Sequence, residues 1–319
     1  MSNGCISVSL YRPDDESGVV DFWKKTMGPD SITAGILRKR ILLDPNFDDN
    51  GFLVARKQAE IVGAALGWNR VTDLPWGFEG HREQDRDTGY LIAFLINSTP
   101  ESSAAGEMLL ERLETFFRGA GKSHASFGDY TPSFFPAGVA PRDCPHLSGL
   151  LQKNGFRAKK VNYAMGRALR DFQVPRAVQE TEDELAGAGV VCSFFEPRRL
   201  LAVREFFGAN FPTWLHNFVD KIERDAPSDE MVIVHDRGRV IGYCQHNYHG
   251  QTDRIGPVGI APECRGRKIG TVMLCRLLES MRRKNLSRAW FGSTDLARTY
   301  YERLGFTVER EIYVMEKEL

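Results

Sequence analysis

The sequence repeats one pattern twice, and this repetition restricts the folds that it can adopt. Residues 52–63 and residues 231–242 each contain an apolar run, a polar turn and a second apolar run that ends at a glycine. Such a pattern is typical of two strands joined by a tight turn. Residues 151–156 match residues 301–306 in a similar way, because both end in Gly-Phe. Several matches in the same order predict two copies of one folding unit.

Each copy is predicted to mix strands and helices. Between the matched segments, each half has an apolar strand, over residues 91–96 and 255–260, followed by a proline and an amphipathic helix. Apolar residues at three- and four-residue spacing form the buried face of such a helix. In the first half this face is predicted to consist of Leu109, Leu113, Phe116 and Phe117. These patterns together predict an α/β (α+β) protein.

The repeats also predict where the domains begin and end. A chain of 319 residues exceeds the length of most single domains. We predict a first domain over residues 1–170 and a second over residues 188–319. Residues 171–187 contain a Val-Pro-Arg run and an acidic stretch, which together indicate a linker with a short helix.

Charge and apolar content exclude several classes of partner. The 42 basic and 42 acidic residues cancel, so no overall field attracts a polyanion, and we expect no nucleic acid as the main partner. The N-terminus lacks the basic region and apolar run of a signal peptide. The longest apolar run, over residues 90–96, is too short to cross a bilayer. We therefore expect no membrane partner.

The six cysteines are scattered, without a Cys-x-x-Cys pair or a cluster with histidines. Because metal sites need such clusters, we expect no metal. Cysteines that remain reduced favour the cytoplasm as the compartment.

Residues 258–274 form the most informative segment of the chain. A strand is predicted to end near Ile260, a polar loop with two glycines follows, and a helix is predicted to begin near Gly270. Glycine allows left-handed backbone angles and the close approach of a ligand. Free N–H groups at the start of a helix attract anions, and the loop's arginines and lysine add positive charge. The segment therefore predicts a phosphate-binding site.

This segment resembles the coenzyme-binding loop of the GNAT N-acetyltransferase superfamily, which has the pattern [Gln/Arg]-x-x-Gly-x-[Gly/Ala] after a strand of the form Val-x-Val-x-Pro. Lys268 stands where the family usually has glycine, and lysine fits there if its backbone angle is an ordinary one. The resemblance implies acetyl-CoA as cosubstrate, its pyrophosphate bound by the loop and its pantetheine paired with the strand backbone. The coenzyme-binding residues that it implies are Val258, Gly259, Ile260, Arg265, Gly266, Arg267, Lys268, Ile269, Gly270, Thr271 and Thr294.

A second feature of the superfamily lies further along the chain. Residues 297–306 resemble its Ala-x-x-x-Tyr-x-x-x-Gly-Phe element, which places Tyr301 where many members have a general acid. A phenol, with a pKa of about 10, stays protonated at neutral pH and can protonate a departing thiolate. His246 is a candidate general base, and a water chain is the alternative.

The resemblance also implies a specific architecture. We expect two tandem GNAT-like domains, each a mixed, mostly antiparallel sheet flanked by helices, as in mycothiol synthase-like proteins. The first copy lacks the chemistry, because the loop predicted over residues 101–105 is short and has no basic residue, and Leu151 takes the place of Tyr301. It has two extra segments, over residues 68–89 and 131–138. Their aromatic residues are expected to line a substrate cleft or to cover a sheet or domain interface.

Together these features predict an acyl-CoA-dependent N-acyltransferase that moves an acetyl group from acetyl-CoA directly to a primary amine of a small molecule or peptide. Holding amine and thioester together supplies much of the catalysis, and backbone N–H groups stabilise the oxyanion. One alternative stays open, an acetyl-CoA-binding sensor without turnover. A tandem aminoacyl transferase that uses charged tRNA should lack the pyrophosphate loop and have a basic surface, and this chain shows the reverse. No pattern in the sequence indicates the amine, the acyl-chain preference or the oligomeric state.

Overall fold

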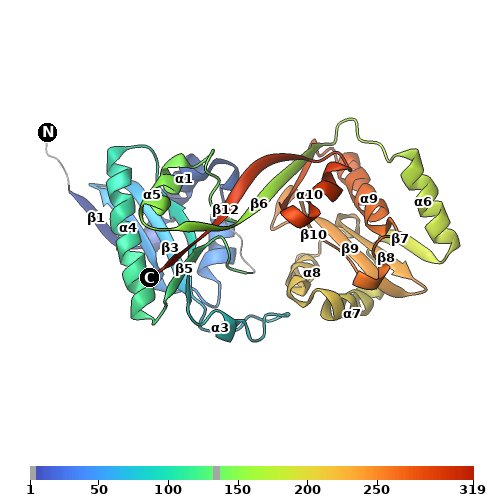
Figure 1. Ribbon diagram of the computed structural model, residues 1–319, viewed down its shortest axis with the longest axis horizontal. Coiled ribbons are helices and arrows are strands. Elements are labelled where there is room, and N and C mark those ends of the chain that lie inside the picture. The colour runs from blue at the N-terminus through green and yellow to red at the C-terminus, as the bar shows by residue number, and fades with distance from the viewer. Residues whose placement is uncertain (1–4, 132–136) are drawn as a thin grey trace. The chain divides into compact units, whose positions relative to one another are not determined.

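The computed structural model describes residues 5–131 and 137–319, except for the side chains of residues 293–296. The chain forms two compact units, each described here by itself (Figure 1). Unit 1 consists of Met1–Leu74, Gly80–Asn162 and Arg310–Leu319, and unit 2 consists of Pro75–Glu79 and Tyr163–Glu309. The domain boundaries predicted from the repeat, 1–170 and 188–319, stay a prediction.

The two halves of the sequence have nearly the same succession of elements. The first half contains β1 (Ile6–Leu10), α1 (Glu16–Met27), α2 (Ala34–Leu37), β2 (Phe52–Lys57), β3 (Glu60–Asn69), α3 (His81–Gln84), β4 (Thr88–Leu95), α4 (Pro100–Gly119), β5 (His124–Phe127), α5 (Pro145–Lys153) and β6 (Arg157–Ala168). After α6 (Arg176–Gly187), the second half contains β7 (Val190–Phe194), α7 (Leu200–Asn210), α8 (Leu215–Glu223), β8 (Met231–Asp236), β9 (Arg239–Tyr248), β10 (Gln251–Ile260), α9 (Ile269–Arg283), β11 (Arg288–Thr294), α10 (Asp295–Glu302) and β12 (Thr307–Glu318).

The repeated hairpin has the same strand register in both units. β2 pairs with β3, and β8 pairs with β9, in antiparallel fashion. In each hairpin the strand register shifts directly after the pair that contains the glycine of the repeated pattern. This pair is Ala55–Gly63 in unit 1 and Val234–Gly242 in unit 2. A bulge at a matching position bends both hairpins at the same point. The pattern that the sequence repeats is therefore repeated in the backbone as well.

The last strands of the two halves are exchanged. In unit 1 the strand order is β1-β2-β3-β4-β5, and the end of β12 pairs with β5 through residues such as Met315 opposite Phe127. In unit 2 the order is β7-β8-β9-β10-β11, with β6 beside β11. Most of the pairing is antiparallel, whereas β4–β5 and β10–β11 are parallel. The predicted mixed, mostly antiparallel sheet is thus confirmed.

Helices cover both faces of the sheet in unit 2. Gly242 and Tyr243 are neighbours on β9 and so point to opposite faces. A Cβ on Gly242 would lie 3.3 Å from the Met273 sulfur of α9. The Tyr243 ring instead packs against the Phe207 ring of α7, with 4.9 Å between centroids. Helices α9 and α7 therefore lie on opposite faces of the sheet (Figure 1).

Each unit has a hydrophobic core of its own. In unit 1, Leu109, Leu113 and Phe117 of α4 are fully buried, as their spacing predicts. In unit 2, α6 occupies the segment predicted to be a linker with a short helix, and its Glu182 pairs with Arg276 of α9 at 2.6 Å. Over the described residues, no helix combines the length and apolarity needed to cross a bilayer.

A buried ion pair fixes the end of β9 that lies away from the loop before α9. Lys221 of α8 is 0% exposed, pairs with Glu230 and donates to the backbone oxygen of His246 at 2.6 Å. The amide of Asn247 donates to the same carboxylate at 3.1 Å. Because each group has a partner, the desolvation of both charges is compensated.

Replacing Lys221 by alanine should destabilise the fold by about 3–5 kcal/mol, because the Glu230 carboxylate would stay buried without its partner. Urea unfolding measures the loss. The double variant Lys221→Met/Glu230→Leu, which removes both charges, should be much closer to the wild type. A single variant that costs less than about 1 kcal/mol would contradict this role of the pair.

Candidate functional site

The loop between β10 and α9 has a backbone shaped for close approach by a ligand. After a short 3-10 turn (Pro262–Cys264), residues 265–268, here called the anion loop, lead into α9. Gly266 has φ 79° and Lys268 has φ 60°, so that both adopt left-handed angles. A Cβ on Gly266 would meet nothing within 4 Å, which means that the loop is open on this side.

The backbone angle of Lys268 is not the ordinary one that a lysine at this position was expected to have. The lysine was expected to fit if its backbone angle were ordinary, but its φ of 60° lies in the region that favours glycine. A left-handed angle costs a residue with a Cβ roughly 1–2 kcal/mol. The anion loop therefore stores strain at the position where the family has glycine, in exchange for an exposed positive charge.

Three of the four backbone N–H groups of the anion loop have no acceptor among the described residues, whereas that of Arg265 donates to the backbone oxygen of Pro262 at 3.3 Å. Thr271 and Val272, in the first turn of α9, donate to the backbone oxygen of Lys268 at 3.0 and 3.2 Å. Among the described residues, no acceptor faces the N–H groups of Gly266, Arg267 and Lys268. Unpaired donors at the start of a helix bind an anion well, because the helix dipole also favours negative charge there.

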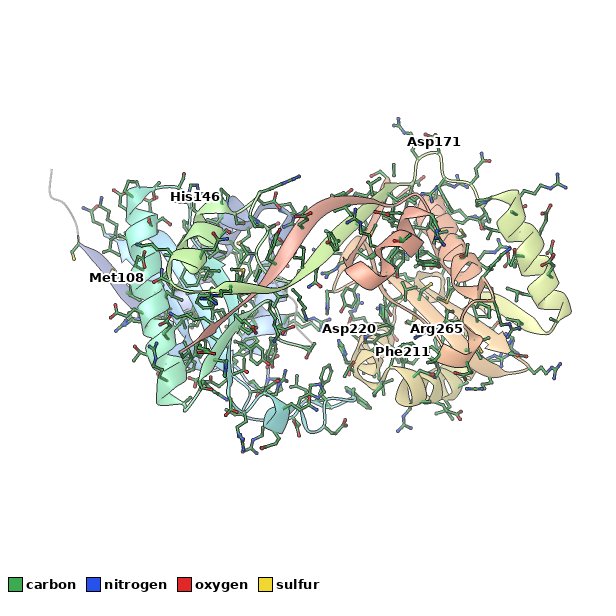
Figure 2. The ribbon with its side chains drawn as sticks, in the orientation of Figure 1. Met108, His146, Asp171, Phe211, Asp220 and Arg265 are labelled. Atoms are coloured by element: carbon green, nitrogen blue, oxygen red, sulfur yellow. The ribbon has the colours of Figure 1, made fainter. Side chains whose placement is uncertain are left out.

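The charged side chains around the anion loop leave its positive groups exposed. Arg265, Arg267 and Lys268 all lie at the surface (Figure 2 labels Arg265). Glu263, just before the loop, pairs with Arg239 at 2.5 Å. The carboxylate nearest in sequence is thus already engaged, and the loop offers cations and N–H donors to a phosphate.

Near the loop, over the described residues, β10 has a strand partner on just one of its two edges. Val258 and Ile260 pair with β9 opposite Cys244 and Gly242. On the other edge, β10 and β11 pair through Arg254 and Trp290, and over the described residues they form no further register pair. Over the described residues, residues 258–260 therefore have no strand partner on this edge, although the Arg265 side chain donates to the backbone oxygen of Ile260 at 3.3 Å. A register irregularity between Ile255 and Val258 accompanies this change.

Two neighbouring tyrosines of α10 have different surroundings, and only Tyr300 is shown to approach the start of α9. Tyr301 lies in an aromatic cluster, 4.2 Å from the Phe291 ring and 6.1 Å from the Phe306 ring between centroids. The Tyr300 hydroxyl lies 3.1 Å from where a Cβ on Gly270 would be. The family pattern indicates Tyr301 alone, and the adjacent pair of tyrosines is the signal in the sequence for the second residue.

Both phenols are protonated at neutral pH. Burial raises the pKa of Tyr300 to about 12, and burial also raises the pKa of Tyr301 above its ordinary value. A proton donor to a thiolate must be in this form.

His246 lies further along the same strands. It is opposite Ile255, which is roughly 16 Å from Ile260 along β10 at the usual rise of a strand. Burial lowers the pKa of His246, and its Nδ1 lies 2.9 Å from the backbone oxygen of Thr252. Nδ1 therefore carries the hydrogen, and Nε2 has a free lone pair with no partner among the described residues. The ring is only 2% exposed.

The other predicted coenzyme-binding residues lie at the end of β10, at the start of α9 and at the end of β11. Val258, Gly259 and Ile260 end β10, and Ile269, Gly270 and Thr271 begin α9. Thr294 ends β11, and its side chain lies outside the described residues.

The corresponding segment of unit 1 is a helix, so that the loop predicted over residues 101–105 is wrong. Helix α4 begins at Pro100, and the Thr99 hydroxyl accepts from the N–H of Ser102 at 3.2 Å. A threonine cap followed by proline favours a helix start at this position. Glu101 adds a carboxylate that pairs with Lys57 at 2.8 Å. This helix start therefore has its own cap and a negative charge.

The model of the acetyltransferase (GNAT) family matches residues 200–306. This segment of the chain, which contains the anion loop and both tyrosines, therefore belongs to the GNAT acetyltransferase family. A search of the curated proteins finds no match to the sequence.

Solved structures of the same fold cover almost the whole chain. A region described as a GCN5-related glucosamine N-acetyltransferase, in a fungal multi-domain GH3 β-N-acetylglucosaminidase, is similar over 99% of this chain, with 20% identity and a TM-score of 0.76. The chain spans 38% of that protein's length.

Two further structures match over nearly their full lengths. A GCN5-related N-acetyltransferase from Sphaerobacter thermophilus covers 98% of this chain and 95% of its own, with 16% identity and a TM-score of 0.65. A tandem GNAT protein from the clavulanic acid biosynthesis pathway covers 98% of both chains, with 13% identity and a TM-score of 0.66. Identities this low show a shared fold, which here is the tandem GNAT fold.

The strain at Lys268 can be measured. Lys268→Gly should be more stable than Lys268→Ala by about 1 kcal/mol, because only glycine adopts the left-handed angle without strain. The difference is smaller than the strain itself, because glycine also has more conformational entropy in the unfolded chain. Both variants lose the same charge, so that their difference in urea unfolding isolates the backbone. Equal stabilities would mean that φ at this position is not left-handed.

Proposed function

We propose that unit 2 transfers an acetyl group from acetyl-CoA to a primary amine of a small molecule or peptide, at one site per chain. The observation that carries this proposal is the anion loop, whose N–H groups at residues 266–268 have no acceptor among the described residues, beside a stretch of β10 that, over the same residues, has no second strand partner. A pyrophosphate fits the first feature, and the amide-bearing pantetheine arm fits the second.

Each part of the site has a role in this proposal. The N–H groups of residues 266–268 bind the pyrophosphate, and Arg265, Arg267 and Lys268 supply charge. The backbone of residues 258–260 pairs with the pantetheine arm and orients the thioester carbonyl. Thr271 and Thr294 remain proposed coenzyme contacts.

Direct transfer needs two proton movements. The neutral amine attacks the thioester carbonyl carbon, a C–N bond forms, and the C–S bond breaks with the electron pair leaving on sulfur. A phenol of α10 gives its proton to the thiolate, and the extra proton of the amine passes to a base. The free Nε2 of His246 can accept that proton only through water, because the ring is buried.

The proposed proton donor can be tested by a pair of matched variants. Tyr301→Phe should lower kcat by about 100-fold while leaving the affinity for acetyl-CoA nearly unchanged, because only the departing thiolate loses its donor. Tyr300→Phe removes the hydroxyl that lies beside Gly270 and serves as the comparison. If only Tyr300→Phe lowers kcat, the donor is Tyr300, and an unchanged kcat in both variants would reassign both rings to packing.

The coenzyme site can be tested by calorimetry. Gly266→Asp should abolish the binding of CoA, because it puts a negative charge where phosphate is expected, whereas Gly266→Ala tests the backbone alone. Ser103→Glu, in the exposed first turn of α4, should leave binding unchanged. Two equivalent sites per chain, or Gly266→Asp binding within about threefold of the wild type, would contradict the proposal.

Turnover decides between the enzyme and the alternative, a sensor that binds acetyl-CoA without reaction. The assay is the release of free thiol from acetyl-CoA with a panel of primary amines. Glucosamine belongs in the panel, because a structural neighbour is described as a glucosamine N-acetyltransferase. Tight binding of CoA with no thiol release from any amine would favour the sensor.

A further inference from the structure

A short segment from the first half of the sequence packs within unit 2. Pro75–Glu79 lies in the stretch between β3 and β4 that is longer than its counterpart, and it belongs to unit 2 although the residues on either side belong to unit 1. Trp76 and Gly77 both have left-handed backbone angles, with φ of 68° and 91°. A non-glycine residue holds such an angle only where its surroundings fix it.

Two contacts fix this segment on the connection between α7 and α8. A Cβ on Gly77 would lie 2.3 Å from the backbone oxygen of Pro212 and 2.8 Å from the nitrogen of Thr213, so that only glycine can come this close. The next residue, Phe78, is 1% exposed, and its ring centroid lies 5.3 Å from that of His216. The segment therefore rests on residues 212–216.

The same connection covers β10 at the proposed acyl site. Phe211 and Trp214 stack face to face, with ring centroids 4.4 Å apart and an interplanar angle of 9°. A Cβ on Gly259 would lie 2.8 Å from both rings, so that the stack lies directly on the strand backbone. Figure 2 shows Phe211 in unit 2 together with Arg265. Both rings are only partly buried and thus present apolar surface.

We propose that Pro75–Glu79 holds this aromatic stack in place as the wall of the acceptor site, and that the acceptor is a primary amine carried on a ring. The inference rests on the proposed function and adds to it the substrate class and the residues that select it. Flat, partly exposed aromatic faces bind rings by stacking and by contact with C–H groups. A flexible polycation gains a cation–π contact for one of its ammonium groups, but its other charges need carboxylates.

Several carboxylates of unit 2 are engaged in ion pairs. Asp220 pairs with Arg224 at 3.0 Å, Glu263 pairs with Arg239, and Glu230 pairs with buried Lys221. A polyamine would have to compete with these internal cations for the three carboxylates, whereas a ring amine gains its contact from the aromatic faces. The stacked, partly exposed rings therefore favour the ring-bearing acceptor.

Gly77, in this segment, and Gly80, just after it, provide a matched pair of variants. Gly77 and Gly80 both have left-handed angles, with φ of 91° and 83°, so that alanine strains the backbone at either position. A Cβ on Gly80 meets nothing within 4 Å, whereas a Cβ on Gly77 collides with Pro212. Gly77→Ala should displace residues 212–216 and the stack, and Gly80→Ala should not.

The experiment is two-substrate kinetics with acetyl-CoA and three acceptors. Tryptamine and glucosamine represent the two sources of a ring, aromatic and sugar, and spermidine represents the polycations. For the wild type we expect kcat/KM to be at least tenfold higher for one of the ring amines than for spermidine. Gly77→Ala should raise the KM for that ring amine at least tenfold, with the KM for acetyl-CoA unchanged, and Gly80→Ala should match the wild type.

Trp76→Ala keeps the inference testable if Gly77→Ala does not fold, because the Trp76 side chain is 43% exposed. It should raise the KM for the ring amine alone. A preference for spermidine, or no turnover of either ring amine by a protein that binds CoA, overturns the acceptor class. Unchanged acceptor kinetics in folded Gly77→Ala or Trp76→Ala overturns the role of the segment. Failure of the proposed function shows earlier and separately, as a wild-type protein that does not bind CoA.

Discussion

The site in unit 2 depends on backbone groups that the fold leaves without partners. A buried strand or helix start normally pairs its N–H and C=O groups, because an unpaired group loses its bonds to water and gains none. Here β10 is paired to β9 up to Ile260, but over the described residues it has no β11 partner after Arg254. Among the same residues, nothing accepts from the N–H groups of residues 266–268. These two sets of groups lie close together in the sequence, so that one extended, phosphate-bearing ligand can reach both.

The open edge of β10 is supported by well-paired structure on every other side. The Tyr243 ring packs on α7, Met273 of α9 lies under Gly242, and the Lys221–Glu230 pair holds the far end of β9. A rigid support of this kind keeps a binding edge in place without the ligand, which reduces the entropy that binding would otherwise cost. The strain at Lys268 fits the same arrangement, because strained residues persist only where the surroundings determine their conformation.

Local features of this protein could be predicted from its sequence, whereas features that depend on distant residues could not. The repeated hairpin and the strand–loop–helix around Gly266 follow from periodicity and from glycine positions within a dozen residues. The exchange of β6 and β12 depends on strand pairing across the whole chain. The helix start at Pro100 was missed because the repeat alignment suggested a loop, although Thr99 and Pro100 form a good cap. The approach of Tyr300 to Gly270 depends on how α10 packs on α9.

The two units therefore differ in which loops can accept an insertion. In unit 2, β9 and β10 are joined by only two residues, His249 and Gly250, and the register of this hairpin sets the position of residues 258–260. An insertion there would shift the strand that the ligand needs. In unit 1 the helix start after β4 is capped by Thr99 and carries the carboxylate of Glu101. No phosphate-bearing ligand is expected there, so the position of the preceding strand need not be kept for one. The longer connection between β3 and β4 is thus tolerated, and its residues Pro75–Glu79 are available to pack in unit 2.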